Sequence, residues 1–330
     1  PRDKVCSGMI MGPVAHTLIK QEFGDIPQTV LSHPDHLDGF MFHVPGIGSH
    51  KIDNFTPLSW RRNLDYWMCQ QAQARGTEIW DSARVTSVER EKQGFSVRLQ
   101  KGKQVHEIKA RFVIGADGVN SVVRKLLFPE FRVRCMQIYE ECYKQEIDLD
   151  RRYFHWFYPL EQSPASFAIH QKDNITVVVF GSAIGWLKPF IVWVKDFLAR
   201  NYHFDTSQKP VSYDGCLEPV LPRGLLTHKY LPAKGNVLLV GEAAGFVLPV
   251  TSEGIGPAVQ SGLMAASSVA KATSSGIKPD EPYVAGFESI FSTFNEIMPW
   301  GKNIEAEMKS GGKSLPRVFA EAYGATLRMF

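Results

Sequence analysis

A Gly-Ala-Asp-Gly turn is the first feature of this sequence that could do chemistry. It follows an apolar run in FVIGADGVNSVVRKLL (112–127), where Asp117 can accept hydrogen bonds and Gly118 permits a tight bend. Asn120 or Ser121 can then cap a helix that carries Arg124. A strand, a turn and a capped helix often form a purely structural unit, so this motif indicates a binding site only together with a second one.

A second glycine-rich turn lies in NVLLVGEAAGFVLPVTSEGIGPAVQSG (236–262). Here an apolar run leads into Gly241 and Glu242, passes Pro249 and opens a helix rich in small residues at Gly254 and Ile255. The N–H groups and partial positive charge at such a helix start favour an electron-rich group, such as the N1/O2 edge of a reduced flavin. The alternative interpretation is a helix that only packs against the preceding strand.

The elements that position these turns indicate a mixed α/β protein. The stretch SWRRNLDYWMCQQAQA (59–74) has apolar residues at helical spacing and is followed by Arg75-Gly76, which predicts a helix that stops there. Short β-type runs from about residue 79 to 110 predict a meander that leads into a buried strand at 112–114. The segment 136–230 is rich in aromatic β-type runs, with a helix expected at 188–202, and is interpreted as a second domain.

Composition narrows the class of protein. A chain of 330 residues with 44% hydrophobic residues can build two domains or one large composite domain, and a net charge of +3 does not indicate a nucleic-acid partner. The five cysteines show no CxxC pair and no zinc-type spacing, so we expect no metal site and a reducing, cytoplasmic location. The longest apolar stretch, 175–187, is shorter than the ~20 residues that span a bilayer.

Together and in this order, the two turns resemble the paired fingerprints of FAD-dependent oxidoreductases, which include aromatic hydroxylases, flavin halogenases and geranylgeranyl reductases. The sequence is most similar to the geranylgeranyl reductase family. The opening KVCSG resembles that family's KxCGG, and residues 241–255 resemble its GDAAGxxxPxxGEGI. Two positions depart from the family pattern, because Glu242 replaces the usual Asp and Ser252 the usual Gly.

The resemblance implies a set of FAD-binding residues. In the family the carboxylate at the position of Glu242 holds the ribityl or pyrophosphate region, often through water. An arginine at the position of Arg61 contacts FAD, although Arg62 offers the same chemistry. Cys6 would lie beside the isoalloxazine ring, where its thiol would either shuttle a proton or line the pocket. The full implied set is Lys4, Cys6, Ser7, Gly8, Arg61, Asp117, Gly118, Gly241, Glu242, Pro249, Gly254 and Ile255.

A third motif, YFHWFYP, carries the residues expected to bind substrate. Phe154, Trp156 and Tyr158 resemble the Y-x-W-x-F-P element on the substrate sheet of the reductases. Halogenases carry W-x-W-x-I-P there, and this chain lacks the first Trp and the Ile. The alternative is an aromatic core strand, since aromatic residues at a period of two are common in sheets.

The fold implied by the resemblance is a Rossmann-like FAD-binding domain with an antiparallel-sheet substrate domain and C-terminal helices. We expect 1–35, 57–134 and 231–275 in the first, 36–56 and 136–230 in the second, and helices over 276–330. Family members begin with a βαβ unit bearing GxGxxG, which is absent from this sequence. We therefore expect that unit to precede PRDKVCSG.

The implied activity is reduction of carbon–carbon double bonds in a polyprenyl or other hydrophobic substrate by an FAD-dependent oxidoreductase. NAD(P)H or ferredoxin would supply electrons, the latter as a partner protein. One alternative is a flavin monooxygenase, and another is a degenerate lipid-binding module without catalysis. The basic and aromatic C-terminal segment is interpreted either as a peripheral membrane contact or as a soluble helical cap.

Overall fold

The computed structural model describes residues 4–129, 133–183, 185–220 and 223–329, and it divides into two compact units. Unit 1 comprises residues 1–72, 135–218 and 297–330, and unit 2 comprises residues 73–134 and 219–296. The expected domain boundaries differ from these: of the residues expected in the FAD-binding domain, 4–35 and 57–72 belong to unit 1. Packing within the chain does not identify the residues that touch a cofactor, so the functional domains stay a prediction.

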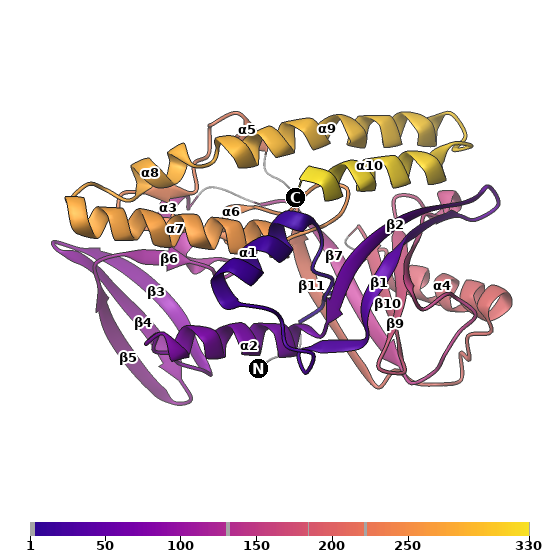
Figure 1. Cartoon of the computed structure of the whole chain (residues 1–330), viewed down its shortest axis with the longest axis horizontal. Coiled ribbons are helices and arrows are strands. Elements are labelled where there is room, and N and C mark those ends of the chain that lie inside the picture. The colour runs from indigo at the N-terminus through magenta and orange to yellow at the C-terminus, as the bar shows by residue number, and fades with distance from the viewer. Residues whose placement is uncertain (1–3, 130–132, 184, 221–222, 330) are drawn as a thin grey trace. The chain divides into compact units, whose positions relative to one another are not determined.

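A seven-stranded, mainly antiparallel sheet is the framework of unit 1 (Figure 1). Its strand order is β11-β7-β10-β9-β8-β1-β2, and β1 and β8 run parallel. The strands are β1 (Leu31–Val44), β2 (Gly48–Ser59), β7 (Cys135–Tyr143), β8 (Tyr153–Phe157), β9 (Ser166–Lys172), β10 (Ile175–Ser182) and β11 (Ser212–Pro219). The antiparallel sheet expected from 36–56 and 136–230 is therefore present.

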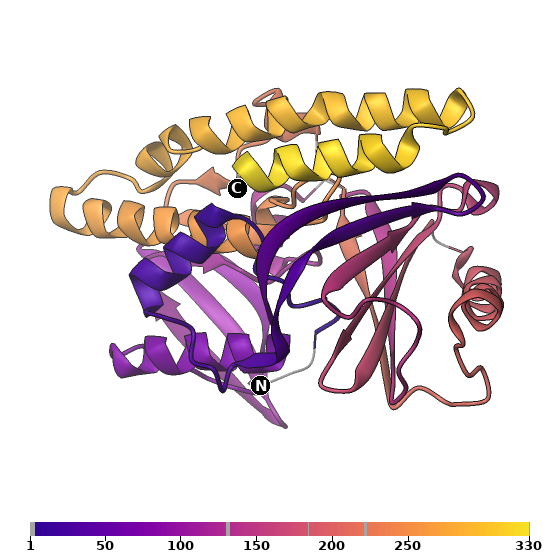
Figure 2. The same cartoon turned by 45° about the vertical axis from the view of Figure 1, so that its right-hand side comes forward.

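Helices cover both faces of this sheet, since alternate residues of the central strands are buried on opposite sides. On one face, Phe167 and Ile169 pack with Phe190 and Val194 of α4. On the other face, Ala168 belongs to a core that includes α10, and Figures 1 and 2 show α10 lying along β1 and β2. The helices with residues in unit 1 are α1 (Pro13–Phe23), α2 (Arg61–Ala74), α4 (Leu187–Tyr202), α9 (Glu288–Lys309) and α10 (Leu315–Met329), with a short 3₁₀ turn at Leu160–Gln162.

Unit 2 contains two three-stranded sheets. One is an antiparallel meander of β3 (Ala83–Glu91), β4 (Gly94–Lys101) and β5 (Gln104–Ala110). The other has the order β12-β13-β6, formed by β12 (Ala233–Lys234), β13 (Val237–Leu239) and β6 (Val113–Gly115), and β6 and β13 run parallel. The helices with residues in unit 2 are the end of α2, α3 (Val122–Leu127), α5 (Arg223–Leu226), α6 (Gly241–Ala244), α7 (Ile255–Ser275), α8 (Asp280–Ala285) and the first part of α9.

Most of the predicted elements are confirmed, with two corrections. The helices expected at 59–74, at 188–202, after Gly254 and over 276–330 are present. The segment around Ile79 lies outside the strands, and Ile114, expected in a buried strand, is 42% exposed. β6 is the edge strand of its sheet, and the face to which Ile114 points is open to solvent.

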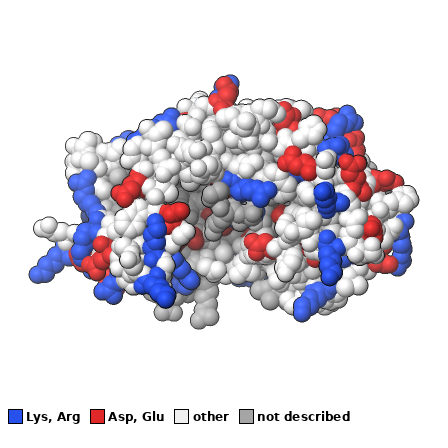
Figure 3. All heavy atoms as spheres, turned by 90° about the horizontal axis from the view of Figure 1, so that it is seen from below, with Lys and Arg blue, Asp and Glu red and all other residues white. Residues whose placement is uncertain are grey.

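The surface shows no large region of one charge on the face seen in Figure 3, where acidic and basic side chains are interspersed. This distribution agrees with the small net charge of +3. Among the described residues, no helix is both long and apolar enough to cross a membrane.

Candidate functional site

The two glycine-rich turns meet at one edge of unit 2. Val113 pairs with Val237 and Gly115 with Leu239 in the parallel β6–β13 ladder, so both strands end at the same edge and both turns follow there. Gly118 has a φ of 72°, and a Cβ on it would lie 3.5 Å from Oε2 of the half-buried Glu242. The two fingerprints therefore form a single structural feature, which we call the fingerprint edge.

Arg124 ties the two turns of the fingerprint edge together. Its side chain is buried, and Nη1 donates to the carbonyl oxygen of Ala243 at 3.1 Å while Nη2 donates to that of Val119. Ser121 caps α3 by accepting the N–H of Arg124 at 2.8 Å. The sequence showed that this helix carries Arg124 but not that its guanidinium reaches the second turn.

Asp117, expected near the cofactor, has a defined local role. Its Oδ2 accepts the N–H groups of Val122 at 2.6 Å and Val123 at 3.3 Å, so the exposed carboxylate stabilises the start of α3. These bonds fix the shape of the turn, whether or not Asp117 also contacts a ligand.

The loop before α7 occupies part of the hydrogen-bonding capacity at the N-terminus of that helix. Glu253 is buried, and its Oε1 accepts the N–H of Gly256 at 2.7 Å, while Gly254 is the N-cap residue before Ile255. Pro249 lies in the turn between Leu248 and Ser252, whose N–H donates to the Leu248 carbonyl at 3.1 Å. Ser252 has a φ of 55°, which explains why a glycine would suit this position in related sequences.

In unit 1, the loop that carries Cys6 is clamped against the end of β2. Ser59 donates its N–H to the Gly8 carbonyl at 3.0 Å, and a Cβ on Gly8 would lie 1.8 Å from the Ser59 oxygen, so only glycine fits. The N–H of Gly8 donates to Cys6 Sγ at 3.5 Å, and half-buried Lys4 lies in the same loop. The backbone contact thus fixes where the thiol lies.

The structure brings Arg61, and not Arg62, to this thiol. Arg61 donates two hydrogen bonds to Asp65, at 2.8 and 3.0 Å. Burial alone would lower the pKa of Arg61, but the Cys6 sulfur and the Asp65 carboxylate favour its charged form and raise that pKa. Arg62 is exposed, with its guanidinium 5.5 Å from the centre of the Trp60 ring.

Lys172, at the end of β9, holds the Cys6 loop from the other side. Its Nζ donates to the carbonyl oxygens of Ser7 at 2.6 Å and Ser59 at 3.0 Å and lies 4.0 Å from the centre of the Trp60 ring. Trp60 is itself fixed by a 2.6 Å bond from Nε1 to Asp173. Lys172 is fully buried, and burial lowers its pKa to about 8 against the opposing effect of Glu140.

Glu140, on β7, is the buried acid near Lys172. Burial raises its pKa to about 7, although the charge of Lys172 and a backbone N–H of Cys6 favour the carboxylate. Cys142 donates its thiol to Oε1 at 3.9 Å, and burial raises the pKa of Cys142 to about 11. We call Cys6, Arg61, Glu140 and Lys172 the Cys6 cluster; sequence reasoning missed Glu140 and Lys172.

The aromatic residues expected to bind substrate lie in the core of unit 1. Phe154 is 2% exposed and stacks on His170, with ring centres 5.2 Å apart. Trp156 packs against the same core, and Tyr158 stacks on Phe319 of α10 at 3.6 Å. This packing matches the alternative of an aromatic core strand, and a substrate role for these residues stays a prediction.

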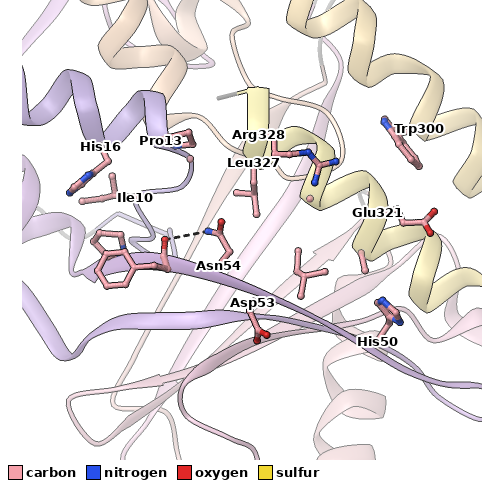
Figure 4. A pocket seen from close by; sticks show the side chains of 16 residues that line it. Ile10, Pro13, His16, His50, Asp53, Asn54, Trp300, Glu321, Leu327 and Arg328 are labelled. Atoms are coloured by element: carbon pink, nitrogen blue, oxygen red, sulfur yellow. Dashed lines mark hydrogen bonds between the residues drawn. The ribbon is translucent and has the colours of Figure 1, made fainter.

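A cavity of about 960 Å³ opens nearby in unit 1 (Figure 4). The start of α1, the strand β2 and the helix α10 form its walls, and Trp300 of α9 contributes one side chain. Much of the lining is apolar, while His50, Asp53 and Arg328 supply polar groups. The cavity has the size of a small-molecule site, and its lining mixes apolar with polar and charged side chains.

Comparison with known proteins shows which families this chain resembles. Residues 60–174 match the family model described as FAD binding domain. A digeranylgeranylglycerophospholipid reductase of Methanococcus vannielii is 28% identical over 221 residues, which cover 65% of this chain and 55% of that protein. The chain spans about half the length of the curated relatives it matches.

Solved structures show the same fold over nearly the whole chain. A geranylgeranyl bacteriochlorophyll reductase-like protein of Thermoplasma acidophilum matches with a TM-score of 0.76 and 16% identity, covering 98% of this chain and 85% of that one. A triple mutant of the flavin-dependent brominase Bmp2 matches with a TM-score of 0.71 and 14% identity, covering 100% and 87%. The chain therefore has the fold of these proteins and is a distant homologue of the digeranylgeranylglycerophospholipid reductases.

Proposed function

We propose that the protein reduces carbon–carbon double bonds in a polyprenyl or other hydrophobic substrate, with NAD(P)H or a ferredoxin as the electron source. The observation that carries this proposal is the place of the Cys6 loop, which is fixed beside Arg61 and lies close to the large cavity of unit 1. The distant homology to digeranylgeranylglycerophospholipid reductases supports the same activity.

The residues present fit an FAD cofactor. At the fingerprint edge, Gly118 has a φ of 72° and leaves its backbone free of a side chain beside Glu242, while Gly241, with a φ of 53°, is buried against Ala258. Glu242 would hold the ribityl or pyrophosphate region there; a contact between Arg61 and the cofactor is what the family resemblance implies and stays a prediction. When bound and reduced, FAD supplies a hydride.

One short antiparallel contact links the lining of the cavity to the Cys6 loop. Ile10 donates its N–H to the Pro57 carbonyl at 3.0 Å, and both residues line the cavity. Two residues along the same contact, Gly8 and Ser59 clamp the Cys6 loop. At about 3.3 Å per residue, this clamp lies about 7 Å along the chain from the cavity lining at Ile10.

Product analysis tests the activity directly. Full-length protein with FAD, reduced without oxygen and mixed with a polyprenyl lipid, should give a product that gains two hydrogen atoms per reduced bond, measured by mass spectrometry. Oxygen consumption with an oxygen atom added to the product would show a monooxygenase instead. A purified protein that binds the lipid but lacks flavin absorbance would show a binding module.

A substitution on α10 tests the cavity as the substrate site. A Cβ on Gly324 would meet only Arg328, at 3.5 Å, so Gly324→Leu should fold and extend into the cavity. Displacing two methylene groups of substrate, at about 0.8 kcal/mol each, would raise KM about 15-fold. FAD affinity should not change, and the matched variant Gly301→Leu, on α9 with open space around it, should keep the wild-type KM. An unchanged KM in Gly324→Leu would remove the cavity from the proposal.

A further inference from the structure

Two buried ionisable residues of the Cys6 cluster do not form a direct ion pair. Lys172 and Glu140 lie on β9 and β7, which flank β10, and their side chains share the face of the sheet that is opposite to α4. Lys172 is 0% exposed and Glu140 is 9% exposed, and Oε2 of Glu140 has no hydrogen-bond partner among the described residues. Burying charges without close pairing is costly, so a purely structural origin explains this arrangement poorly.

The anchoring role of Lys172 does not require its positive charge. Two hydrogen bonds, to the carbonyl oxygens of Ser7 and Ser59, hold the Cys6 loop. A neutral amine still has two N–H donors, so it can make both bonds after it loses its third proton. Lys172 can therefore exchange a proton while the loop stays in place.

Resting on the proposed function, we propose that Glu140 and Lys172 form a proton store that supplies, through the Cys6 thiol, the proton consumed when a double bond is reduced. The π bond of the substrate breaks and two C–H bonds form. The reduced flavin provides the hydride and is oxidised, while the thiol provides the proton. Glu140 or Lys172 reprotonates the sulfur and then takes a proton from water.

The electrostatics of the cluster suit this role near neutral pH. Burial raises the pKa of Glu140 to about 7 and lowers that of Lys172 to about 8, so neutral and charged forms of the two residues are close in free energy. The charge of Lys172 interacts with the Cys6 thiol, and Glu140 accepts the backbone N–H of Cys6. The other ionisable groups that interact with the two residues are Cys142 on β7, His170 on β9, Asp173 in the β9–β10 turn and Asp214 on β11, while Arg61 on α2 faces Cys6.

His170 does not compete for the proton. Burial lowers its pKa well below the usual value, and the charge of Lys172 lowers it further. Both ring nitrogens lack hydrogen-bond partners among the residues that the structure describes. A neutral imidazole beside Lys172 leaves Glu140 and Lys172 as the groups that change protonation near neutral pH.

Glu140→Gln in the full-length protein with FAD tests the proposal, because it keeps the shape of the side chain and removes its proton. Infrared spectroscopy should show the carbonyl band of a protonated buried carboxyl group in the wild type, lost as the pH rises through about 7 and absent from Glu140→Gln. Lys172→Met, if it folds, should keep this band to higher pH, since the charge of Lys172 favours the carboxylate.

Steady-state reduction of the substrate with saturating reductant gives the second measurement, because the sulfur must be reprotonated between turnovers. The wild-type rate should fall as the pH rises through about 7, and Glu140→Gln should be about 10²-fold slower without this pH dependence. The matched control is Glu141→Gln, because Glu141 is the next residue on β7, equally buried, and pairs with Lys195 at 2.9 Å. It should keep the wild-type band, rate and pH profile.

The outcomes separate the two proposals. A missing infrared band at Glu140, or a wild-type rate and pH profile in Glu140→Gln, would overturn the proton store while leaving the reductase activity intact. A wild-type protein that reduces no double bond would overturn the proposed function, and the infrared titration would still decide whether Glu140 carries a proton near neutral pH.

Discussion

Replacing Arg124 with methionine should loosen the fingerprint edge of unit 2. Arg124 is 6% exposed and its guanidinium joins the Gly-Ala-Asp-Gly turn to the Gly-Glu-Ala-Ala-Gly turn through the carbonyl oxygens of Val119 and Ala243. Methionine preserves much of the apolar stem but offers no donor to either oxygen. The substitution therefore removes the link between the turns with little change in packing.

The magnitude follows from the two hydrogen bonds. A hydrogen bond from a charged donor contributes about 1.5–3 kcal/mol to stability. The variant also no longer has the desolvation cost of a buried charge, which offsets part of the loss. We expect a net loss of about 3 kcal/mol. If this loss appears as local opening, amides in 113–127 and 237–247 should exchange hydrogen about 100-fold faster, since about 1.4 kcal/mol corresponds to a factor of ten.

Hydrogen exchange followed by mass spectrometry can measure this change peptide by peptide. The matched control is Lys125→Met, which alters the neighbouring residue of α3 but removes an exposed side chain. It should change exchange by less than about threefold, as expected for a surface substitution. If Arg124→Met behaved like Lys125→Met, the two turns would be held together by the β6–β13 ladder alone, and the role assigned to Arg124 would be wrong.

Two further predictions concern stability. Gly241→Ala should lower the free energy of unfolding in urea by about 1 kcal/mol more than Gly102→Ala does. Both glycines have a positive φ, but only at Gly241 would a Cβ meet a neighbour, Ala258 at 3.1 Å. Equal losses in the two variants would show that Ala258 moves aside without cost. Burial, followed by the charge of His155, lowers the pKa of His43 to about 3, and burial also lowers that of His155. In the unfolded chain each of these histidines binds a proton near pH 6.5. The free energy of unfolding should therefore be highest above about pH 6.5, and below that pH it should fall by up to about 1.4 kcal/mol per pH unit for each histidine. Urea unfolding at about pH 7 and pH 5 should show this fall in the free energy of unfolding, and His43→Gln should show a smaller one. An equal fall in the variant would contradict the contribution assigned to His43.

The sequence predicted the fingerprint edge because its parts are local. Each glycine-rich turn directly follows an apolar run, and two parallel strands bring their ends to the same edge whatever lies between them. The contact between Gly118 and Glu242 is thus a consequence of strand pairing. The link made by Arg124 depends on the direction of one long side chain, which spacing along the chain does not specify.

The Cys6 cluster could be predicted only in part. Cys6 and Arg61 stand in motifs that resemble those of a known family, but the sequence left Arg61 and Arg62 equivalent. The structure separates them by the turn of α2, which directs Arg61 to the thiol and leaves Arg62 exposed. Glu140 and Lys172 carried no such motif, since Glu140 has an acidic neighbour and Lys172 stands before a turn, and both patterns are typical of exposed residues.

The position of Lys172 follows from the alternation of β9. Phe167, Ile169 and Gln171 point to one face of the sheet, so Ala168, His170 and Lys172 must point to the other, where the Cys6 loop ends. The turn at Asp173 then fixes the register, because its carboxylate binds both the N–H of His33 and the indole of Trp60. One residue inserted before Asp173 would turn the lysine away from Ser7 and Ser59. The alternation that builds the core of unit 1 therefore also determines which charged side chain lies beside the Cys6 loop.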